Sequence, residues 1–218
     1  MKVLSWNIFY YLTDLHWRTR KIAEISNLEN PDIICFQEVL PETGLILLDV
    51  LKNYNSLYKT PSENNSLVRE YGEMIFVKKE INIMNKFFVE LPSKQGRTCT
   101  FVDLHYEGDI IRIATAHLES LQQNDAKRID QVNKIKEELI KVDNWIWIGD
   151  SNFEYTPEGF CNFKEPTWHQ SRFWDGSDTK CYDKILTNMN VGSFRLVGNE
   201  QICGKWLSDH DGIIIDVL

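Results

Sequence analysis

Short apolar runs that end in polar residues recur along this chain of 218 residues, and they restrict its fold more than any other feature. Runs this short, rich in Ile, Val, Phe and Trp, are typical of β-strands. We expect strands at residues 2–6, 33–36, 72–77, 83–90, 98–106, 110–116, 145–148, 182–187, 192–197 and 212–217. Helical periodicity is confined to residues 17–29, 42–52 and 124–142.

The order of these elements predicts a mixed α/β (α+β) architecture. Strand–helix–strand units open the chain and hairpin-like runs follow, so we expect two packed sheets covered by helices. The helix positions expected to face the core are Ile22, Ile25 and Leu28 in the first helix, and Ile129, Val132, Ile135, Leu139 and Val142 in the last. The polar stretch 61–66 is expected to be a loop. Because no linker or repeat divides the chain, we expect one domain over residues 1–218.

The balance of charge excludes one broad class of function. Lys and Arg total 24 against 32 Asp and Glu, which gives a formal net charge of −8. A protein that coats nucleic acid non-specifically needs the opposite sign. An enzyme that acts on a polyanion through a metal ion stays compatible, because a divalent cation reverses the local field. With 43% hydrophobic residues, the chain has the composition of a globular protein.

The cysteines and the apolar segments indicate an intracellular protein, in the nucleus or the cytoplasm, that does not span a membrane. The chain has five cysteines, an odd number, and no Cys-x-x-Cys motif, so reduced thiols are expected rather than a disulfide scaffold or a zinc site. Residues 1–7 do not resemble the apolar stretch of a signal peptide. No segment approaches the ~20 apolar residues that a transmembrane helix needs.

Polar side chains beside the predicted strands are the candidate functional residues. Several strands end in an amide, a carboxylate or an imidazole, and the last strand is preceded by Asp209 and His210. Because strand ends gather at one edge of a sheet, with function on the adjoining loops, we expect one shared rim. The side chains delivered to it are Asn7, Glu38, His117, Asp150, Asn152, Asp209 and His210.

The residue types at this rim suit phosphoester hydrolysis. Carboxylate and amide oxygens are the ligands that Mg²⁺ prefers, and Mg²⁺ needs only one or two carboxylates besides water and substrate phosphate. Imidazoles can stabilise charge that develops on phosphoryl oxygens, and a further carboxylate can orient the attacking water. No Ser or Cys stands in a recognisable nucleophile motif. Direct attack by water is therefore favoured over a covalent intermediate.

Each of these residues also has an ordinary structural interpretation. A glutamate after a strand, such as Glu38, is commonly a strand-end residue, and Gly149-Asp150 is a common turn. The segment 208–212 is equally compatible with a loop that contains an Asx-turn. His105 and His169 are assigned no role. The functional interpretation therefore depends on the order of the candidates along the chain.

That order resembles the endonuclease/exonuclease/phosphatase superfamily, the DNase-I-like fold. The resemblance rests on the runs Trp6-Asn7, Gln37-Glu38-Val39, His117-Leu118, Gly149-Asp150-x-Asn152, Tyr182-Asp183-Lys184-Ile185 and Ser208-Asp209-His210. Within the superfamily, the run at 115–120 and the Thr167-Trp168 pair look most like the 5′-tyrosyl-DNA phosphodiesterase branch, as do Arg128 and Gln131. The resemblance implies a four-layer αββα sandwich of two mixed β-sheets flanked by helices, with Mg²⁺-dependent hydrolysis.

The resemblance also implies roles around the metal ion and the attacking water. Glu38 looks like the principal Mg²⁺ ligand, with Mn²⁺ able to substitute, and Asp209 is expected beside the metal through water. Asn7 is similar to the family residue near the metal and the scissile phosphate. Asp150 resembles the residue that orients and deprotonates the attacking water, assisted by Asn152.

Two histidines are placed on the phosphate by the same resemblance. His210 resembles the histidine that stabilises the transition state, and Asp183 looks like the carboxylate that orients it. His117 resembles a second histidine that contacts the phosphate. Together with Mg²⁺, these groups would meet the negative charge that develops as water attacks. Ser120, at the end of the same motif as His117, is counted among the substrate contacts.

The chain departs from the branch at positions where basic residues are usual. Leu121-Gln122 and Phe153-Glu154 stand there instead, which removes positive charge from the expected DNA-facing rim. Arg97 lies near a matching arginine of the family. Together with Lys94 it either compensates for the lost charge or belongs to an ordinary solvated charge pair.

Aromatic residues are the other candidates for binding a strand. Trp168 and Phe173-Trp174 fall in a loop-like stretch, where base stacking would contribute ~1–3 kcal/mol per base. The alternative is a loop pinned to the core by its rings. Trp145 and Trp147 lie in a predicted strand and are expected in the core.

These observations predict a Mg²⁺-dependent phosphodiesterase that removes a 5′-linked tyrosine or peptide from single-stranded DNA and leaves a 5′-phosphate. We expect a monomer that binds nucleic acid and no membrane. One alternative is another enzyme of the same fold, such as a general DNA or RNA nuclease, an abasic-site endonuclease or a phosphoinositide phosphatase. The other is a non-catalytic binding module, which the apparently complete catalytic set disfavours.

Overall fold

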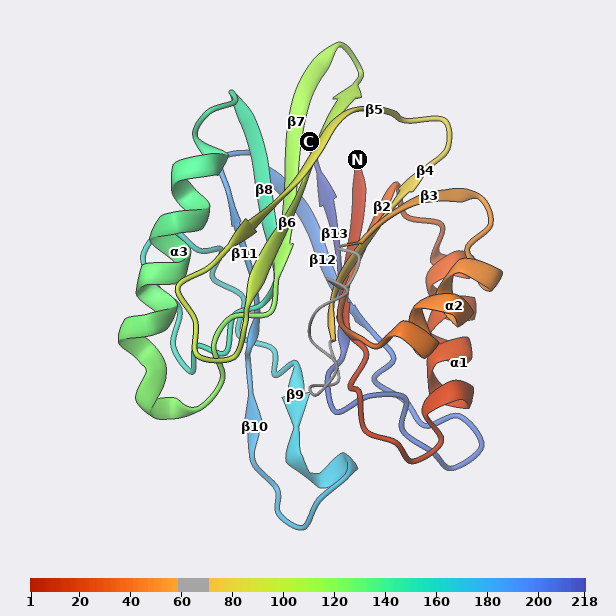
Figure 1. The fold of residues 1–218 in the computed structure, drawn as a ribbon. Coiled ribbons are helices and arrows are strands. Elements are labelled where there is room, and N and C mark those ends of the chain that lie inside the picture. Colours follow the sequence, from red (N-terminus) through yellow and green to blue (C-terminus); the bar gives the residue numbers. More distant parts are fainter. Residues whose placement is uncertain (59–70) are drawn as a thin grey trace.

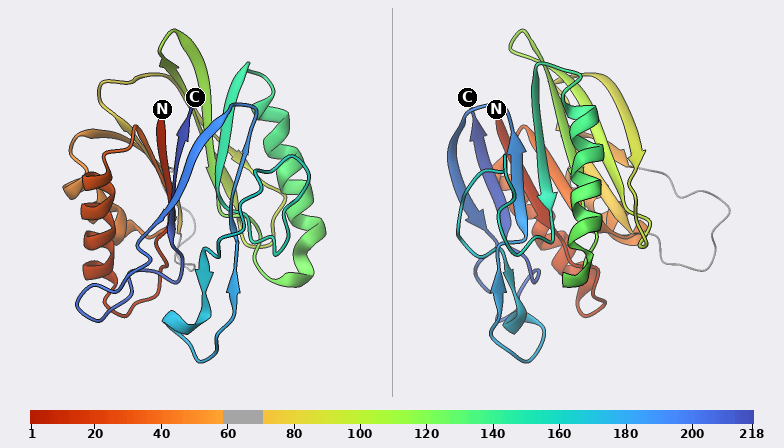
Figure 2. Two further views of the ribbon diagram at one scale, coloured as in Figure 1. Left: turned by 180° about the vertical axis from the view of Figure 1, so that it is seen from behind. Right: turned by 90° about the vertical axis from the view of Figure 1, so that its left-hand side faces the viewer.

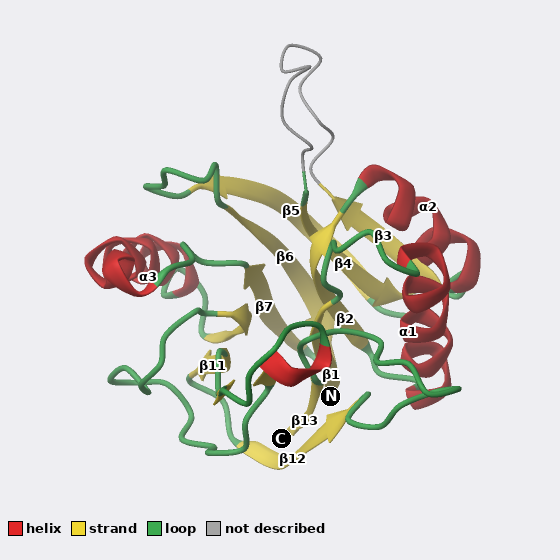
Figure 3. Cartoon of the chain, turned by 90° about the horizontal axis from the view of Figure 1, so that it is seen from below, coloured by secondary structure: helices red, strands yellow, loops and turns green. Residues whose placement is uncertain are grey.

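The computed structural model describes residues 1–58 and 71–218, so the loop expected at 61–66 lies outside the described residues. Two β-sheets pack face to face, with α1 (Leu15–Glu29) and α2 (Pro41–Val50) outside one sheet and α3 (Asp125–Leu139) outside the other (Figure 1). Figure 3 looks along the sandwich and separates these layers. The predicted αββα sandwich of two mixed sheets is confirmed.

The first sheet has six strands in the order β12-β13-β1-β2-β4-β3. The strands are β1 (Lys2–Asn7), β2 (Ile33–Val39), β3 (Tyr54–Tyr58), β4 (Gly72–Lys78), β12 (Val191–Val197) and β13 (Gly212–Val217). Only β1 and β2 are parallel neighbours, because α1 carries the chain back between them. Their register pairs Asn7 with Gln37, so the end of β1 lies beside Glu38.

The second sheet has five strands in the order β11-β8-β7-β6-β5. The strands are β5 (Asn82–Glu90), β6 (Thr98–Tyr106), β7 (Asp109–Ala116), β8 (Asn144–Asp150) and β11 (Asp183–Thr187). The parallel pair here is β7 and β8, connected by the 3-10 turn η1 (Gln122–Asn124) and α3. The register of β11 on β8 places Asp183 opposite Asp150.

A small hairpin projects from the end of the sandwich where β1 and β8 finish (Figures 1 and 2). It consists of β9 (Trp168–His169), the 3-10 turn η2 (Gln170–Arg172) and β10 (Thr179–Lys180). Backbone hydrogen bonds join it to the segment before β13, from His169 to Asp209 at 2.8 Å and from Asp211 to Thr167 at 2.7 Å. The hairpin is therefore fixed beside the candidate residues Asp209 and His210.

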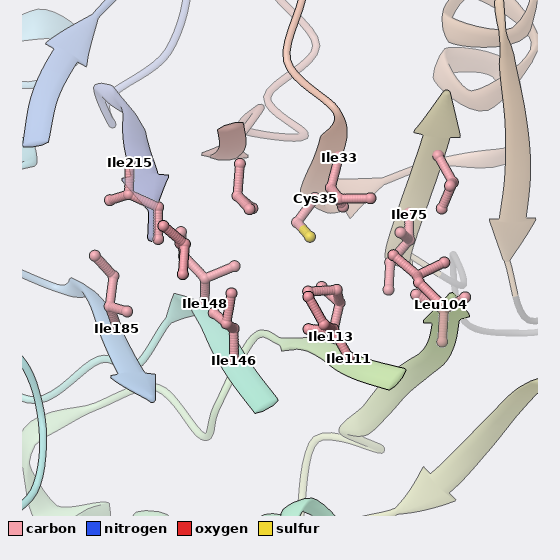
Figure 4. Close-up of a cluster of buried hydrophobic side chains, with 14 of the residues drawn as sticks. Ile33, Cys35, Ile75, Leu104, Ile111, Ile113, Ile146, Ile148, Ile185 and Ile215 are labelled. Atoms are coloured by element: carbon pink, nitrogen blue, oxygen red, sulfur yellow. The ribbon is translucent and has the colours of Figure 1, made fainter. Parts of the chain in front are cut away.

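Apolar side chains fill the space between the sheets and the spaces beneath the helices. Between the sheets, Ile33, Ile75 and Ile215 of the first sheet lie opposite Leu104, Ile113, Ile146 and Ile148 of the second (Figure 4). Burial of one such side chain stabilises the fold by about 1.5–3 kcal/mol. This core holds the two sheets face to face, and the residues at one end of both sheets share one rim.

Two predicted core positions are wrong because polar residues occupy the buried face of each helix. Leu28 is 85% exposed and Ile129 is 46% exposed. The buried face of α1 includes Arg18, and that of α3 includes Arg128. An apolar pattern alone therefore misplaces the buried face of each helix by about one position. Both guanidinium groups are buried and donate hydrogen bonds to backbone carbonyls.

Three smaller expectations can be compared with the structure. Among the described residues, no helix is long and apolar enough to cross a membrane. All five cysteines are free, as expected without a disulfide scaffold. Trp147 is fully buried, whereas Trp145 is only partly buried against the core beneath α3.

Candidate active site

Side chains at the ends of β1, β2 and β8 meet at the shared rim of the two sheets. Asn7 is the last residue of β1, Glu38 lies near the end of β2 and Asp150 is the last residue of β8. The Asn7 amide nitrogen donates to Glu38 Oε1 at 3.1 Å and to Asp150 Oδ2 at 2.9 Å. One buried amide therefore connects carboxylates that belong to opposite sheets.

Glu38 reaches this position through a local break in its strand. The pairing of β2 with β4 shifts register between Phe36 and Val39, and Glu38 has a φ of 60°. A left-handed backbone at a non-glycine residue costs about 1–3 kcal/mol, and such strained residues cluster at functional sites. The Tyr10 backbone N–H donates to Glu38 Oε2 at 3.0 Å, which fixes the carboxylate.

Asp150 is oriented by the turn that follows β8. Its Oδ1 accepts the Asn152 backbone N–H at 3.0 Å, while Oδ2 accepts from Asn7. Asn152 has a φ of 53°, and its side-chain amide donates to the Leu118 carbonyl at 3.1 Å. Asn152 therefore shapes the turn that presents Asp150, and its amide is directed toward the backbone beyond β7.

His210 forms a pair with Asp183. The His210 Nδ1–Asp183 Oδ2 distance is 2.7 Å, and because a carboxylate only accepts, Nδ1 carries a proton. Burial lowers the pKa of His210, but the carboxylates of Asp183, Asp209 and Asp150 raise it well above the usual value. The imidazole is therefore positively charged at neutral pH. Its Nε2 lies 3.6 Å from Asp150 Oδ2, beyond hydrogen-bond range.

His117, just beyond β7, is neutral where His210 is positively charged. Burial and the neighbouring Arg97 guanidinium lower its pKa to about 3, so the ring is neutral at neutral pH. Its Nδ1 lies 3.6 Å from Glu38 Oε1 and its Nε2 lies 3.4 Å from Asp150 Oδ2. These close approaches are consequently not ion pairs. The two site histidines differ by one charge within the same buried cluster.

Asp209 completes the acidic half of the site. Trp168 Nε1–H donates to Asp209 Oδ2 at 2.9 Å, and the Trp168 backbone forms a bridge with His210. The Ser208 hydroxyl donates to the Asn7 carbonyl at 2.7 Å, which ties the segment before β13 to β1. Trp168 thus orients Asp209 with its indole N–H while its ring stays partly exposed beside the site.

Arg97 and Ser120 lie at different depths. Arg97 is 5% exposed, donates to the Tyr71 hydroxyl at 2.8 Å and approaches His117 Nε2 at 3.3 Å. The Ser120 hydroxyl lies toward solvent and bonds the Gln95 side chain, at 3.0 Å to its oxygen. The structure therefore brings Arg97 into the site. Ser120 lies outside it and is connected to Arg97 through the Gln95 side chain.

The buried Glu119 carboxylate fixes the loop that carries Arg97 through hydrogen bonds. Glu119 accepts the Ser93 hydroxyl at 2.5 Å and the Lys94 backbone N–H at 3.0 Å. Gln131 of α3 accepts the Glu119 backbone N–H at 2.8 Å. Ser93 in turn accepts the Arg97 backbone N–H at 3.1 Å, so α3 is connected to the site through this loop.

Glu73, on β4, is a buried site neighbour that sequence reasoning missed. Its carboxylate accepts the His117 backbone N–H at 3.2 Å and the Thr98 hydroxyl at 3.1 Å. Burial raises the pKa of Glu73 to about 7. The signal was present, since Glu73 is the second residue of the run predicted at 72–77, much as Glu38 lies just after the run predicted at 33–36. The prediction missed Glu73 because it covered residues that follow an apolar run, and residues that precede one only at the last strand.

The carboxylates of the site fit a divalent cation that uses few protein ligands. Burial raises the pKa of Glu38 to about 7, with the charge of Asp209 adding to the effect, and burial raises the pKa of Asp209 as well. A bound divalent cation would stabilise the ionised forms of both carboxylates. Within residues 1–58 and 71–218, no three His, Cys, Asp or Glu side chains gather as ligands of one metal ion. Carboxylate and amide oxygens are the donors that hard divalent cations prefer, so Glu38, Asp209 and Asn7 fit such an ion.

Comparison with known proteins finds the family that the sequence motifs resemble, over most of the chain. The sequence pattern of the endonuclease/exonuclease/phosphatase family matches residues 4–210. Tyrosyl-DNA phosphodiesterase 2 of Homo sapiens is 24% identical over 254 residues, which cover 99% of this chain and 67% of that protein. The chain thus spans about two thirds of the length of such curated relatives.

Solved structures show the fold at lower sequence identity. A humanized D. rerio TDP2 with 14 mutations has a TM-score of 0.88 and 19% identity, covering 100% of this chain and 98% of that one. D. rerio TDP2 complexed with a single-strand DNA product has a TM-score of 0.87 and 20% identity, covering 99% and 97% of the two chains. The whole sandwich, including the small hairpin, therefore has a counterpart of known structure.

Proposed function

We propose that this chain, which belongs to the endonuclease/exonuclease/phosphatase family, releases tyrosine from the 5′ end of single-stranded DNA and leaves a 5′-phosphate. The family and the curated relatives together indicate a phosphodiesterase hydrolase. The observation that carries the proposal is the Asn7 amide that joins Glu38 and Asp150 across the two sheets beside a charged His210. The names of the curated relatives support a tyrosyl–DNA linkage as the substrate.

Asp150 is suited to activate the attacking water. Each of its carboxylate oxygens accepts one hydrogen bond from the protein, one from Asn7 and one from the Asn152 backbone. Since each oxygen has two lone pairs, acceptor capacity remains for a water molecule. Asp150 would orient this water and take its proton as the new P–O bond forms.

His210 and His117 are suited to the phosphoryl oxygens. The Nε2–H of the charged His210 imidazole is too far from Asp150 to donate a hydrogen bond to it. It can therefore donate to a phosphoryl oxygen that gains negative charge. Asp183 holds the ring in place through Nδ1. His117, neutral and beside Arg97, would contribute a second polar contact without adding charge.

The leaving group places a modest demand on the protein. The bond that breaks joins phosphorus to the tyrosine oxygen, and a phenol has a pKa of about 10. The phenolate can depart and take a proton from solvent, so the site needs no dedicated acid close to it. An ordinary DNA linkage has a more basic alkoxide leaving group, which the same site would expel less readily.

A divalent cation would complete the site. Glu38 would hold Mg²⁺ or Mn²⁺, with Asp209 bound through water and Asn7 alongside. When bound, the cation would act as a Lewis acid that neutralises charge on the phosphoryl oxygens. The protein contributes the orientation of Glu38, through the Tyr10 backbone N–H and the Asn7 amide.

A side-by-side assay with Mg²⁺ tests the proposal. The substrates are a 5′-phosphotyrosyl single-stranded oligonucleotide, the same strand without tyrosine, and a soluble phosphoinositide. We expect tyrosine release to be the fastest reaction and to stop in EDTA. Internal cutting of the unmodified strand at a higher rate would assign the chain to the nucleases of the family, and faster phosphate release from the phosphoinositide would assign it to the phosphatases.

A further inference from the structure

A continuous series of aromatic rings runs around the candidate site from one histidine to the other. We call these rings the aromatic collar: Tyr71, Tyr10, Phe9, Trp174, Trp168 and Tyr182. Successive ring centroids, starting at His117 and ending at His210, are 6.1, 5.1, 6.3, 5.2, 6.4, 5.5 and 6.4 Å apart. Both histidines approach Asp150, so the collar begins and ends beside this carboxylate.

Two collar rings are presented to solvent. Tyr10 is 44% exposed and Trp174 is 44% exposed, whereas Phe9 between them is 7% exposed. Tyr10 stacks on Tyr71 with an interplanar angle of 14°, and its backbone N–H contacts the Glu38 carboxylate. Exposed aromatic rings that belong to one contiguous series beside a catalytic site indicate a binding surface, whereas single exposed rings need no explanation.

A buried arginine makes the first part of the collar rigid. All donor nitrogens of Arg18 bond to backbone carbonyls, those of Thr13, Ile8, Leu207, Phe9 and Tyr11. The Arg18 guanidinium also lies over the rings of Phe9 and Phe173, at 5.4 and 5.3 Å. The loop that presents Tyr10 is therefore preorganised, and a ligand that stacks on it pays little ordering entropy.

The charges near the collar do not suit a row of phosphates. Arg18 is 1% exposed and Arg97, which lies over the Tyr71 ring at 5.3 Å, is 5% exposed. These cations support the rings from beneath and are committed to protein partners. The chain also has a net charge of −8, and residues 121–122 and 153–154 carry no basic side chain. A strand would have to bind through its bases, with its phosphates toward water.

We propose that Tyr10 and Trp174 stack on the unpaired nucleobases next to the scissile 5′ linkage, so that this chain selects a single-stranded end by stacking more than by phosphate contacts. The proposal rests on the proposed function and names how that site recognises its substrate. Base–aromatic stacking is available to every base, so little sequence preference follows. Bases that are paired in a duplex cannot present their faces to the rings.

Binding of the product strand tests the proposal without any turnover. The probe is a 5′-phosphorylated single-stranded oligonucleotide, titrated in Mg²⁺ at several salt concentrations by fluorescence anisotropy. We expect Tyr10→Ala and Trp174→Ala each to raise Kd about 5-fold to 100-fold, as loss of one stacked base implies. Tyr10→Phe retains the ring and should bind as the natural chain does. The salt dependence should be shallow, because few phosphates are neutralised.

Kinetics separate this proposal from the proposed function. Trp174→Ala should raise KM for the 5′-phosphotyrosyl strand with kcat unchanged, and this increase should disappear on a base-free substrate, the same strand with abasic nucleotides next to the linkage. Ile110→Ala, at a 45% exposed position at the far end of β7, is the control and should change neither. If the natural chain binds the strand but releases no tyrosine, the proposed function fails while the stacking surface stands.

Three results would overturn the stacking surface. One is an unchanged Kd in both Tyr10→Ala and Trp174→Ala. The second is an equal loss on the base-free substrate, which would make the rings supports of the catalytic carboxylates. The third is an increase in KM that follows the length of a peptide on the 5′ phosphate instead of the number of unpaired bases, which would assign the collar to the leaving protein.

Discussion

At the scale of single residues, the site depends on charge states that its neighbours impose. His210 lies against Asp183 and near two more carboxylates, so it keeps its proton, whereas His117 lies beside Arg97 and loses its own. One ring can therefore act as a cationic donor and the other as a neutral one. The same residue type serves two purposes because the surroundings separate the two pKa values.

The first prediction concerns the groups that touch water and phosphate. Asp150→Asn and His210→Ala should each lower kcat by ~10²–10³, since each removes a group placed against charge or a proton that moves in the transition state. Turnover of bis(p-nitrophenyl) phosphate in Mg²⁺ measures the effect. His105→Ala, at the far end of the second sheet where His105 pairs with Ile110, is the control and should keep full activity. A folded Asp150→Asn or His210→Ala with natural turnover would remove these assignments.

The second prediction concerns the pH dependence of metal binding. The pKa of Glu38, raised to about 7 by burial and by Asp209, means that this carboxyl is protonated below pH 7 in the metal-free chain. A cation must then displace a proton, so its affinity should fall about tenfold per pH unit below 7 and level off above it. Titration calorimetry with Mn²⁺ between pH 5.5 and 8.5 measures this. A flat profile, or one unchanged in Glu38→Gln, would show that Glu38 is not a ligand.

Residue types were easier to predict than residue geometry. Asn7, Glu38, Asp150 and His210 could be selected because each adjoins an apolar run, and the structure brings all of them together. The left-handed backbone at Glu38 could not be predicted, since no glycine marks it. It arises from the bulge in β2, which depends on the partner strand β4.

At the scale of elements, helix α3 supports the site without touching it. Gln131 of α3 holds Glu119, and Glu119 holds the loop at 93–97, which ends in Arg97. The helix also covers the second sheet with apolar residues such as Ile135 and Leu139. One element therefore contributes both core packing and the placement of a guanidinium beside His117.

The third prediction tests that connection. Glu119→Gln should lower kcat/KM about tenfold, because its amide cannot accept both the Ser93 hydroxyl and the Lys94 N–H as the carboxylate does. In an Arg97→Ala background the same substitution should have no further effect, since coupled residues are not additive. The matched control is Asp103→Asn, which breaks a buried ion pair with Arg112 away from the loop.

Fold stability and kcat/KM together distinguish a positioning role of Glu119 from a purely structural one. Asp103→Asn should lower the stability of the fold and leave kcat/KM unchanged. If Glu119→Gln does the same, or if its effect persists fully in Arg97→Ala, then Glu119 is a structural carboxylate and does not act through the loop.

Element boundaries followed from the sequence where apolar runs were long and failed where polarity was mixed. The strands at 98–106 and 212–217 agree with β6 and β13 in the structure. The edge strand β3 was missed because its residues are largely polar, and the two-residue strands β9 and β10 carry too little pattern to recognise. Mixed polarity also explains the wrong prediction for Leu28. The buried face of α1 includes the polar residue Arg18, and Leu28 is exposed.

At the scale of the whole molecule, the rim exists because two sheets end together. Asn7 and Glu38 belong to the first sheet, Asp150 and Asp183 to the second, and the core between them sets their separation. The resemblance named in the sequence predicted this sandwich, and the order of motifs placed the candidates at one end. Trp168 and Trp174 were candidates for base stacking from the sequence, whereas the collar as a whole could not be predicted, since its rings come from four separate segments.

The fourth prediction concerns the expected single domain over residues 1–218. Because one core is shared by both sheets, urea unfolding followed by circular dichroism and by tryptophan fluorescence should give one coincident transition. Ile113→Ala, fully buried between the sheets, should lower the free energy of unfolding by about 2–5 kcal/mol. Ile110→Ala on the same strand is largely exposed and should cost far less. Two separate transitions would divide the chain into more than one folding unit.

The central claim is that water, activated by Asp150, attacks phosphorus in a 5′-phosphotyrosyl strand at this rim. The most direct test is mass spectrometry of the products formed in oxygen-18 water with Mg²⁺ and the single-stranded substrate. The account predicts an intact strand whose new 5′-phosphate carries the heavy oxygen, together with unlabelled tyrosine. Internal fragments of the strand, or heavy oxygen in the tyrosine, would contradict it.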